Sequence, residues 1–240
     1  MRFTSILLLA GIAGFTSCHF GMGERVSGNG HIVKDDRKVS TFHNVQISGS
    51  MNVRIRQDAD TRVNIEADEN LMSYIEAYTD GDKLVVREKR GFNLNPTRDI
   101  TIYVASPLYS TIDVSGSGDV LGENEITGNG ELQTSISGSG NMKLKVNVQS
   151  LKSEISGSGS VGFSGESKDF DLSISGSANA HCFDLVSDNV SISISGSSDA
   201  QVTANQKLDV SVSGSGSVKY KGNASVNQRV SGSGEVRKVE

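Results

Sequence analysis

A seven-residue phrase recurs seven times in the second half of the chain and limits the fold more than any other feature. Each copy reads β-branched residue, Ser, Gly, Ser, Gly or another small residue, a polar residue, and an apolar residue or Ala. The copies begin at Val114, Ile136, Ile155, Ile174, Ile194, Val212 and Val230, at spacings of 22, 19, 19, 20, 18 and 18 residues. A period of about 20 residues is typical of solenoids, whereas a propeller blade needs about 40 to 45. The chain is therefore expected to be a repeat protein.

Each repeat holds two strand-like segments, such as residues 142–148 and the segment that ends at Ile155. Coils stacked at about 4.7 to 4.9 Å pair every strand with the coils above and below, and bury the Ile and Val columns. We therefore predict an all-β fold, a parallel β-helix-like solenoid with about 18 to 22 residues per coil.

The glycines are part of this period. Twelve of the 27 glycines lie in the two glycine columns of the phrase, so their abundance is structural and does not indicate a linker. Because Gly tolerates positive φ and close backbone approach, we expect the chain to bend at each Ser-Gly-Ser-Gly step. The predicted structural turn residues are Gly116, Gly138, Gly157, Gly176, Gly196, Gly214 and Gly232.

The region before the repeats also alternates apolar and polar residues, which indicates half-buried strands. Only residues 68–75 look helical, with Asp68 as a possible cap, and residues 89–98 are expected to be one long irregular loop. Similar phrases begin at Val26 and Ile47, which suggests that both halves are variations on one coil. We therefore divide the folded part into an N-terminal β region, 38–107, and a repeat solenoid, 108–240, with a soft boundary.

The first 17 residues have the pattern of a secretory signal: Arg2, an apolar run from Ile6 to Ala13, and small residues. Cys18 follows Thr and Ser, as the lipidated Cys does in a bacterial lipobox. We therefore expect residues 1–17 to be removed, Cys18 to be acylated, and residues 18–37 to form a tether. The alternative is an ordinary secretory peptide cut near Ala13. The expected location is the bacterial cell envelope, after secretion across the inner membrane, as an outer-membrane lipoprotein.

Composition excludes some functions. The net charge is -5 and Lys and Arg cluster only at residues 87–90, so we expect no nucleic-acid partner. Absence of Trp and a 5% aromatic content weaken any prediction of sugar-stacking platforms. Cys182 is expected to be a small buried residue. It is not expected to act as a catalytic thiol, because His181, its nearest candidate base, points to the opposite face of a strand. No cofactor is expected.

Two kinds of polar column run through the repeats. The polar residues after the second glycine position include acids and amides that could bind Ca²⁺, but the calcium β-roll motif is missing, so we favour solvated turn residues and predict no metal site. These residues are Asp119, Asn141, Ser160, Asn179, Asp199, Ser217 and Glu235. Two serine columns could present hydroxyls to a repetitive polymer or lattice, although turn packing is the preferred interpretation.

Catalysis is the less favoured interpretation. None of the four His lies in a repeat phrase, which leaves the serines without a base. Asp35 and Asp36 are adjacent, but we expect them in a solvated loop because Lys and Arg flank them. We predict no catalytic residues.

The sequence from Phe42 to Val53, the segment from Val63 to Leu71 and the Ser-Gly-Ser-Gly coils together resemble the bacterial DUF2807 family of auto-transporter adhesins with a head GIN domain. The resemblance covers roughly residues 38–238. It implies a right-handed β-helix-like fold and a lipoprotein or secreted envelope protein, and it supplies no catalytic motif.

The first hypothesis is a non-enzymatic envelope lipoprotein, an adhesin or scaffold whose partners are a membrane, through the lipid, and a polysaccharide or protein surface. One alternative is a carbohydrate-active β-helix enzyme, a lyase or hydrolase, with its site in the 89–98 loop. Another is a calcium- or lattice-binding module.

Overall fold

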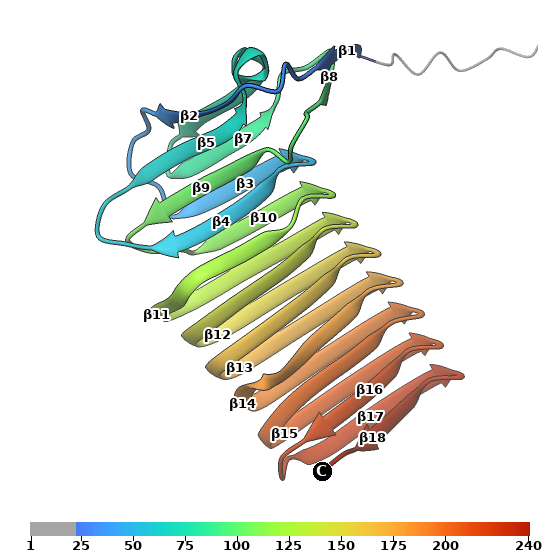
Figure 1. The fold of residues 1–240 in the computed structure, drawn as a ribbon. Coiled ribbons are helices and arrows are strands. Elements are labelled where there is room, and N and C mark those ends of the chain that lie inside the picture. The colour runs from blue at the N-terminus through green and yellow to red at the C-terminus, as the bar shows by residue number, and fades with distance from the viewer. Residues whose placement is uncertain (1–22) are drawn as a thin grey trace, which may run out of the picture.

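The structure is a computed structural model that describes residues 23–240. The expected signal segment and Cys18 lie outside these residues. Most of the chain is a stack of β coils, and a region with crossing strands and one short helix covers one end of the stack (Figure 1).

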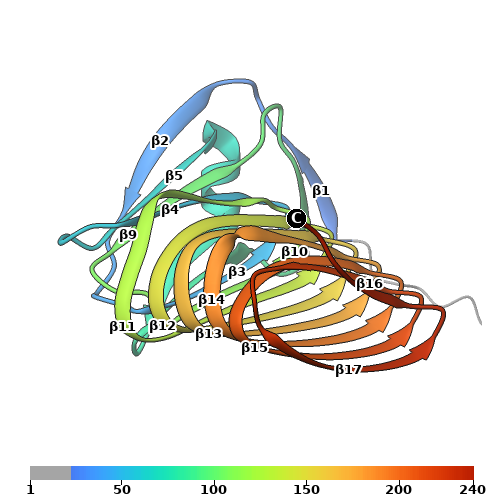
Figure 2. The same cartoon turned by 90° about the horizontal axis from the view of Figure 1, so that it is seen from below.

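The repeats form the predicted parallel β-solenoid. Each neighbour in the stack pairs in parallel, and the register keeps the phrases aligned, with Gly138 opposite Gly116 and Gly157 opposite Gly138. Seen from below, the coils lie one behind another (Figure 2). The strands are β10 (Thr111–Gly116), β11 (Val120–Gly138), β12 (Asn141–Gly157), β13 (Ser160–Gly176), β14 (Asn179–Gly196), β15 (Asp199–Gly214), β16 (Ser217–Lys221), β17 (Ser225–Gly232) and β18 (Glu235–Lys238).

Each long strand bends smoothly at one side of the coil, and the chain reverses sharply at the other side, between one strand and the next (Figure 2). Side chains that point inward fill the space between the two faces of the coil. Ile155 and Ile174 are each 2% exposed, and the rings of Phe163 and Phe170 pack edge to face at 6.1 Å. Cys182 is buried, as predicted. The interior is thus a packed core.

The last coil ends the core with polar residues. Gln228 pairs with Val210 and Lys238 pairs with Tyr220, so both stand at positions that earlier coils give to buried or partly buried apolar and aromatic side chains. Polar and charged residues at such positions discourage further strands from adding to an open edge.

The N-terminal region continues the same stack. β3 pairs with β10 in the register of the repeats, with Gly49 opposite Gly116, and β4 pairs with β11. The phrase at Ile47 is therefore part of the coil column, and the sheet runs without a break past residue 107. The elements are β3 (Asn44–Gly49), β4 (Asn52–Gln57), β5 (Arg62–Asp68), the 3₁₀ helix η1 (Glu69–Tyr74), β6 (Ile75–Asp80), β7 (Lys83–Glu88) and β9 (Thr101–Ser106). Antiparallel pairs occur here, between β6 and β7 and between β5 and β9.

Five local expectations were wrong. Residues 18–37 are not all tether, because β1 (Glu24–Ser27) and β2 (Ile32–Arg37) are strands. The loop expected at 89–98 contains β8 (Phe92–Asn95), which pairs with β1, so the phrase at Val26 lies outside the coil column. Asp35 and Asp36 were expected in a solvated loop, but they lie in β2, which pairs antiparallel with β5.

The fifth concerns Asp68, which does not cap the helix through its side chain. Its carboxylate instead accepts hydrogen bonds from the Gly30 and Thr97 N–H groups, at 2.7 and 2.9 Å, and from the Thr97 hydroxyl. Long-range partners therefore replaced the local cap that the sequence suggested.

Within residues 23–240, no helix is both long enough and apolar enough to cross a bilayer.

Candidate functional site

The seven predicted turn glycines lie at the sharp reversal of each coil, here called the hook. Their φ angles range from 119° to 134°, a region that other residues rarely adopt. A Cβ on any of them would also overlap the carbonyl oxygen of the aligned glycine in the preceding coil, as Gly157 would with Gly138. The backbone therefore requires Gly here on two independent grounds.

Backbone groups also hold the hook. The N–H of Ser158 donates to the Gly138 carbonyl at 2.9 Å, and the N–H of Ser177 donates to Gly157 at 2.9 Å. Serine side chains of both columns are exposed in all seven repeats. The serine hydroxyls thus form the surface of the hook.

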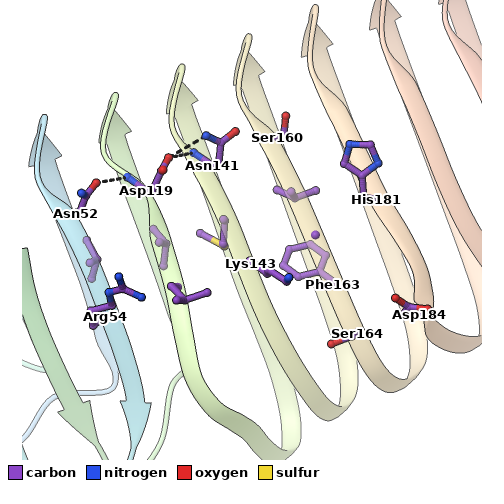
Figure 3. Close-up of a pocket in the computed structure, with 16 residues that line it drawn as sticks. Asn52, Arg54, Asp119, Asn141, Lys143, Ser160, Phe163, Ser164, His181 and Asp184 are labelled. Carbon is purple, nitrogen blue, oxygen red and sulfur yellow. Dashed lines mark hydrogen bonds between the residues drawn. The ribbon is translucent and has the colours of Figure 1, made fainter.

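The polar column begins one strand earlier than the repeats. Asp119 donates its N–H to the Asn52 side-chain oxygen at 3.0 Å, and its carboxylate accepts from the N–H and side-chain amide of Asn141, at 3.0 and 2.9 Å (Figure 3). Asn52 and Asn141 therefore engage this acid from both sides. Across residues 23–240, no group of three or more His, Cys, Asp or Glu side chains is placed to hold a metal ion.

A shallow groove of about 550 Å³ lies beside this ladder, on the outer face of the coils. It crosses β4, β11, β12, β13 and β14, so it joins the N-terminal region to the repeats (Figure 3). The outward-facing residues that line it are Asn52, Arg54, Asp119, Leu121, Asn141, Lys143, Ser160, Gly162, Ser164, His181 and Asp184.

One row of residues runs across the groove from strand to strand. The register places Arg54 opposite Leu121, Leu121 opposite Lys143, Lys143 opposite Gly162, and Gly162 opposite His181. A Cβ on Gly162 would lie in ordinary contact with the His181 carbonyl oxygen at 3.8 Å, so its absence leaves a gap of about one methyl group between Lys143 and His181. The row therefore offers two cations, one apolar side chain, a gap at Gly162 and the imidazole of His181.

The cations in this row differ from their neighbours. Arg56 lies 3.6 Å from Asp58, and Lys145 lies 3.3 Å from Glu125. Arg54 and Lys143 form no ion pair with any residue in the described range 23–240. Each unpaired cation is thus two residues from a paired one on the same strand.

The sequence analysis did not find this groove. Arg54 and Lys143 are 89 positions apart, and only the pairing of β4 with β11 and β11 with β12 brings them into one row. The alternation around each residue predicts that it faces outward, but no periodic signal connects the two.

The other sites considered in the sequence have structural roles or lie elsewhere. Burial raises the pKa of the Cys182 thiol to about 12, so it stays protonated and unreactive at neutral pH. The 89–98 segment, the proposed site of the enzyme alternative, supplies β8 and the Thr97 groups that bind Asp68. It does not line the groove.

Comparison with known proteins agrees with this architecture. A family model described as "Putative auto-transporter adhesin, head GIN domain" (DUF2807) matches residues 41–224. Among curated proteins, none matches the chain.

Solved structures share the fold. A putative adhesin from Bacteroides fragilis superposes with a TM-score of 0.83 at 24% identity, over 89% of this chain and 100% of its own. A putative lipid binding protein from Parabacteroides distasonis gives 0.76 at 24% identity, over 90% and 100%. A putative adhesin from Parabacteroides merdae gives 0.66 at 21% identity, over 91% and 100%. With its matched segment, its solenoid and these neighbours, the chain belongs to the DUF2807 family of adhesin head domains, whose description indicates a cell-surface or envelope protein of adhesin type.

Proposed function

We propose that this protein is a non-enzymatic lipoprotein of the bacterial cell envelope that acts as an adhesin and holds an extended partner, a polysaccharide or a protein surface, along the groove. The observation that carries the proposal is the groove itself, which crosses five stacked strands. At about 4.8 Å per strand it extends for roughly 20 Å across the coils. An open surface of that length suits part of a long chain better than one small molecule.

Lipid binding is the other function that a structural neighbour's name raises. In this chain, packed apolar side chains such as Leu144, Phe163 and Leu172 fill the solenoid. An acyl chain would have to lie in the groove, where charged and amide side chains would lose water without gaining partners. The groove therefore favours a polar partner.

The proposed anchor is Cys18, supported by the signal-like sequence before it. Each buried CH₂ of an acyl chain contributes about 0.8 kcal/mol to membrane binding, and several chains make the attachment lasting. Many anchored copies on one membrane would bind a polymeric partner with avidity, even if each groove binds it weakly.

The anchor is tested by metabolic labelling with a fatty-acid analogue. Wild-type protein should be labelled and recovered with membranes, and Cys18→Ala should be unlabelled. Recovery of unlabelled wild-type protein in the soluble fraction would show that Cys18 is not an anchor.

Adhesion is tested by comparing vesicles that carry the lipidated protein with the soluble Cys18→Ala protein. Vesicles should bind immobilised bacterial or host cell surfaces, and the soluble monomer should bind them poorly, with and without Ca²⁺. Tight, saturable binding of one small molecule by the monomer would contradict the proposal. So would turnover of a polysaccharide that is lost when acidic residues are replaced.

A further inference from the structure

We propose that the groove binds an anionic glycan, with Arg54 and Lys143 as the contacts for its carboxylate or sulfate groups. This inference rests on the proposed function and names the chemistry of the partner. Arg54 and Lys143 lie on either side of Leu121 in one row, so their Cα atoms are about 10 Å apart at the usual strand spacing. That separation fits a chain with negative charges at intervals of about two sugar units.

The two cations are available for a ligand. Two acids on the same strands as the row are used by other cations, since Asp58 follows β4 and binds Arg56 and Arg62, and Glu125 on β11 binds Lys145. Arg54 is half-buried and Lys143 is exposed, and both line the groove. Although the chain has a net charge of -5, two cations without an ion pair to any of residues 23–240 therefore lie together in the groove.

Acidic residues limit where a negative group can sit. Asp119 lies at the strand-start side of the row and is hydrogen-bonded to Asn141, whereas Asp184 lies on the other side of the row, three positions after His181 on β14 (Figure 3). Both would repel an anion at the margins. Negative groups are therefore favoured along the row itself, over Arg54 on β4 and Lys143 on β12.

The remaining lining suits sugar rings. Asn141, Ser160 and Ser164 present amide and hydroxyl groups that can exchange hydrogen bonds with sugar hydroxyls. Leu121 offers a small apolar surface, and the gap at Gly162 lets a ring approach the sheet. Without aromatic platforms, each contact is weak, which agrees with an adhesin that depends on many copies.

Other polyanions fit less well. Nucleic acid needs a dense set of phosphate contacts, and two free cations on an acidic protein do not provide it. A peptide could gain main-chain hydrogen bonds only at a free strand edge. The groove instead lies on a sheet face whose strands are already paired on both sides. An acidic peptide would therefore have only side-chain contacts.

The test compares two double variants with the same change in charge. Arg54→Ala/Lys143→Ala removes the groove cations, and Arg56→Ala/Lys145→Ala removes paired cations from the same strands and the same outward face. Vesicles that carry each lipidated protein are added to immobilised hyaluronan, polygalacturonate, alginate and dextran sulfate. The uncharged controls are the methyl esters of the first three polymers and plain dextran, and poly-glutamate serves as the acidic peptide. Equal melting temperatures for both variants and the wild type establish that they are folded.

Vesicles that carry the wild-type protein should bind at least one anionic glycan and should bind its uncharged form much more weakly. Their binding should decrease as the salt concentration rises. The groove variant should bind that glycan about tenfold more weakly, and the control variant should stay within about twofold of wild type. Equal losses in the two variants, equal binding to charged and uncharged polymers, or stronger binding to poly-glutamate would each overturn the inference. Vesicles that adhere to cells but bind no anionic glycan would overturn it and leave the adhesin proposal standing, whereas vesicles that adhere to nothing would overturn both.

Discussion

Apart from the separate β1–β8 pair, the repeat coils and the N-terminal region belong to one sheet, but different kinds of contact stabilise the two regions. In β11–β15, the same backbone ladder and the same hook glycine occur in every coil. In the N-terminal region, single buried side chains tie together segments that are far apart. Ser106 donates to the Phe42 carbonyl at 2.6 Å, and the Tyr109 hydroxyl donates to the Arg56 or Val104 carbonyl, at 2.9 and 3.0 Å.

This difference has consequences for how substitutions act. A change at one hook disturbs an interaction that recurs in the coils above and below, because each glycine rests on the one before it. A change at a single buried side chain of the N-terminal region removes a contact with no second copy. The predictions below probe each kind of contact, beginning with the largest expected effect.

Gly157→Val should cause the largest loss. The residue has a φ of 132°, which a β-branched side chain hardly tolerates, and the new side chain would overlap the Gly138 carbonyl. We expect the free energy of unfolding to fall by well over the ~1 kcal/mol typical of point substitutions. Thermal unfolding followed by circular dichroism measures it.

Two matched controls accompany this variant. Ser156→Ala changes the exposed neighbour, and Gly130→Ala adds a Cβ where no atom lies within 4 Å and φ is not positive. Both should cost much less. Melting shifts as large as that of Gly157→Val would show that the hook geometry is not what constrains the chain.

Asp68→Asn tests the N-terminal region. The amide keeps one oxygen, so its NH₂ group would face either the Thr97 N–H, which donates to one carboxylate oxygen, or the Gly30 N–H and the Thr97 hydroxyl, which donate to the other. Because Asp68 is 0% exposed, water cannot replace the lost bonds, and we expect a loss of about 1 to 3 kcal/mol in the free energy of unfolding. The exposed Asp60→Asn is the control, and an equal loss in both would refute the role of the buried carboxylate.

The same residue predicts a pH dependence. Burial alone would raise the pKa of Asp68, but hydrogen bonds from Thr97 and Gly30 outweigh it and hold the pKa below its ordinary value of 3.8. The carboxylate therefore stabilises the fold above that value, and its contribution is lost as the pH falls through the lowered pKa. The difference in melting temperature between wild type and Asp68→Asn should be constant near neutral pH and shrink in acid. A difference that widens in acid would contradict this sign.

Ser153→Ala should have the smallest effect, and in the opposite direction. Ser153 is 1% exposed and its hydroxyl has no hydrogen-bond partner, in a column that later coils fill with Leu172 and Ile192. Removing it should raise the free energy of unfolding by up to about 1 kcal/mol. The hydroxyl of Ser187 lies 2.8 Å from that of Ser167, so Ser187→Ala should lower the free energy of unfolding by a similar amount. Denaturant titration of the two variants distinguishes these signs, and a loss in both would mean that Ser153 has a partner.

Local rules failed mainly in the N-terminal region. Asp68 has the position and the residue type of a helix cap, yet Gly30 and Thr97 bind it instead, 38 and 29 positions away. The segment 89–98 has the Gly and Pro of a loop, but Phe92–Asn95 pairs with β1. In each case the deciding partner is distant in sequence and occurs only once, so no periodic pattern could indicate it.

The sequence by itself determined the coil. The repeated phrase predicted the parallel stack and its 18- to 22-residue period, because the same side chains meet the same backbone constraint in every turn. The family resemblance rested on these coils together with the segments from Phe42 to Val53 and from Val63 to Leu71. Tertiary structure alone decided how the N-terminal strands cover the stack and which outward residues share a row. Arg54 and Lys143 became neighbours only when β4 paired with β11, since strand pairing across a long sequence separation is set by the packing of the whole sheet and not by the residues around either cation.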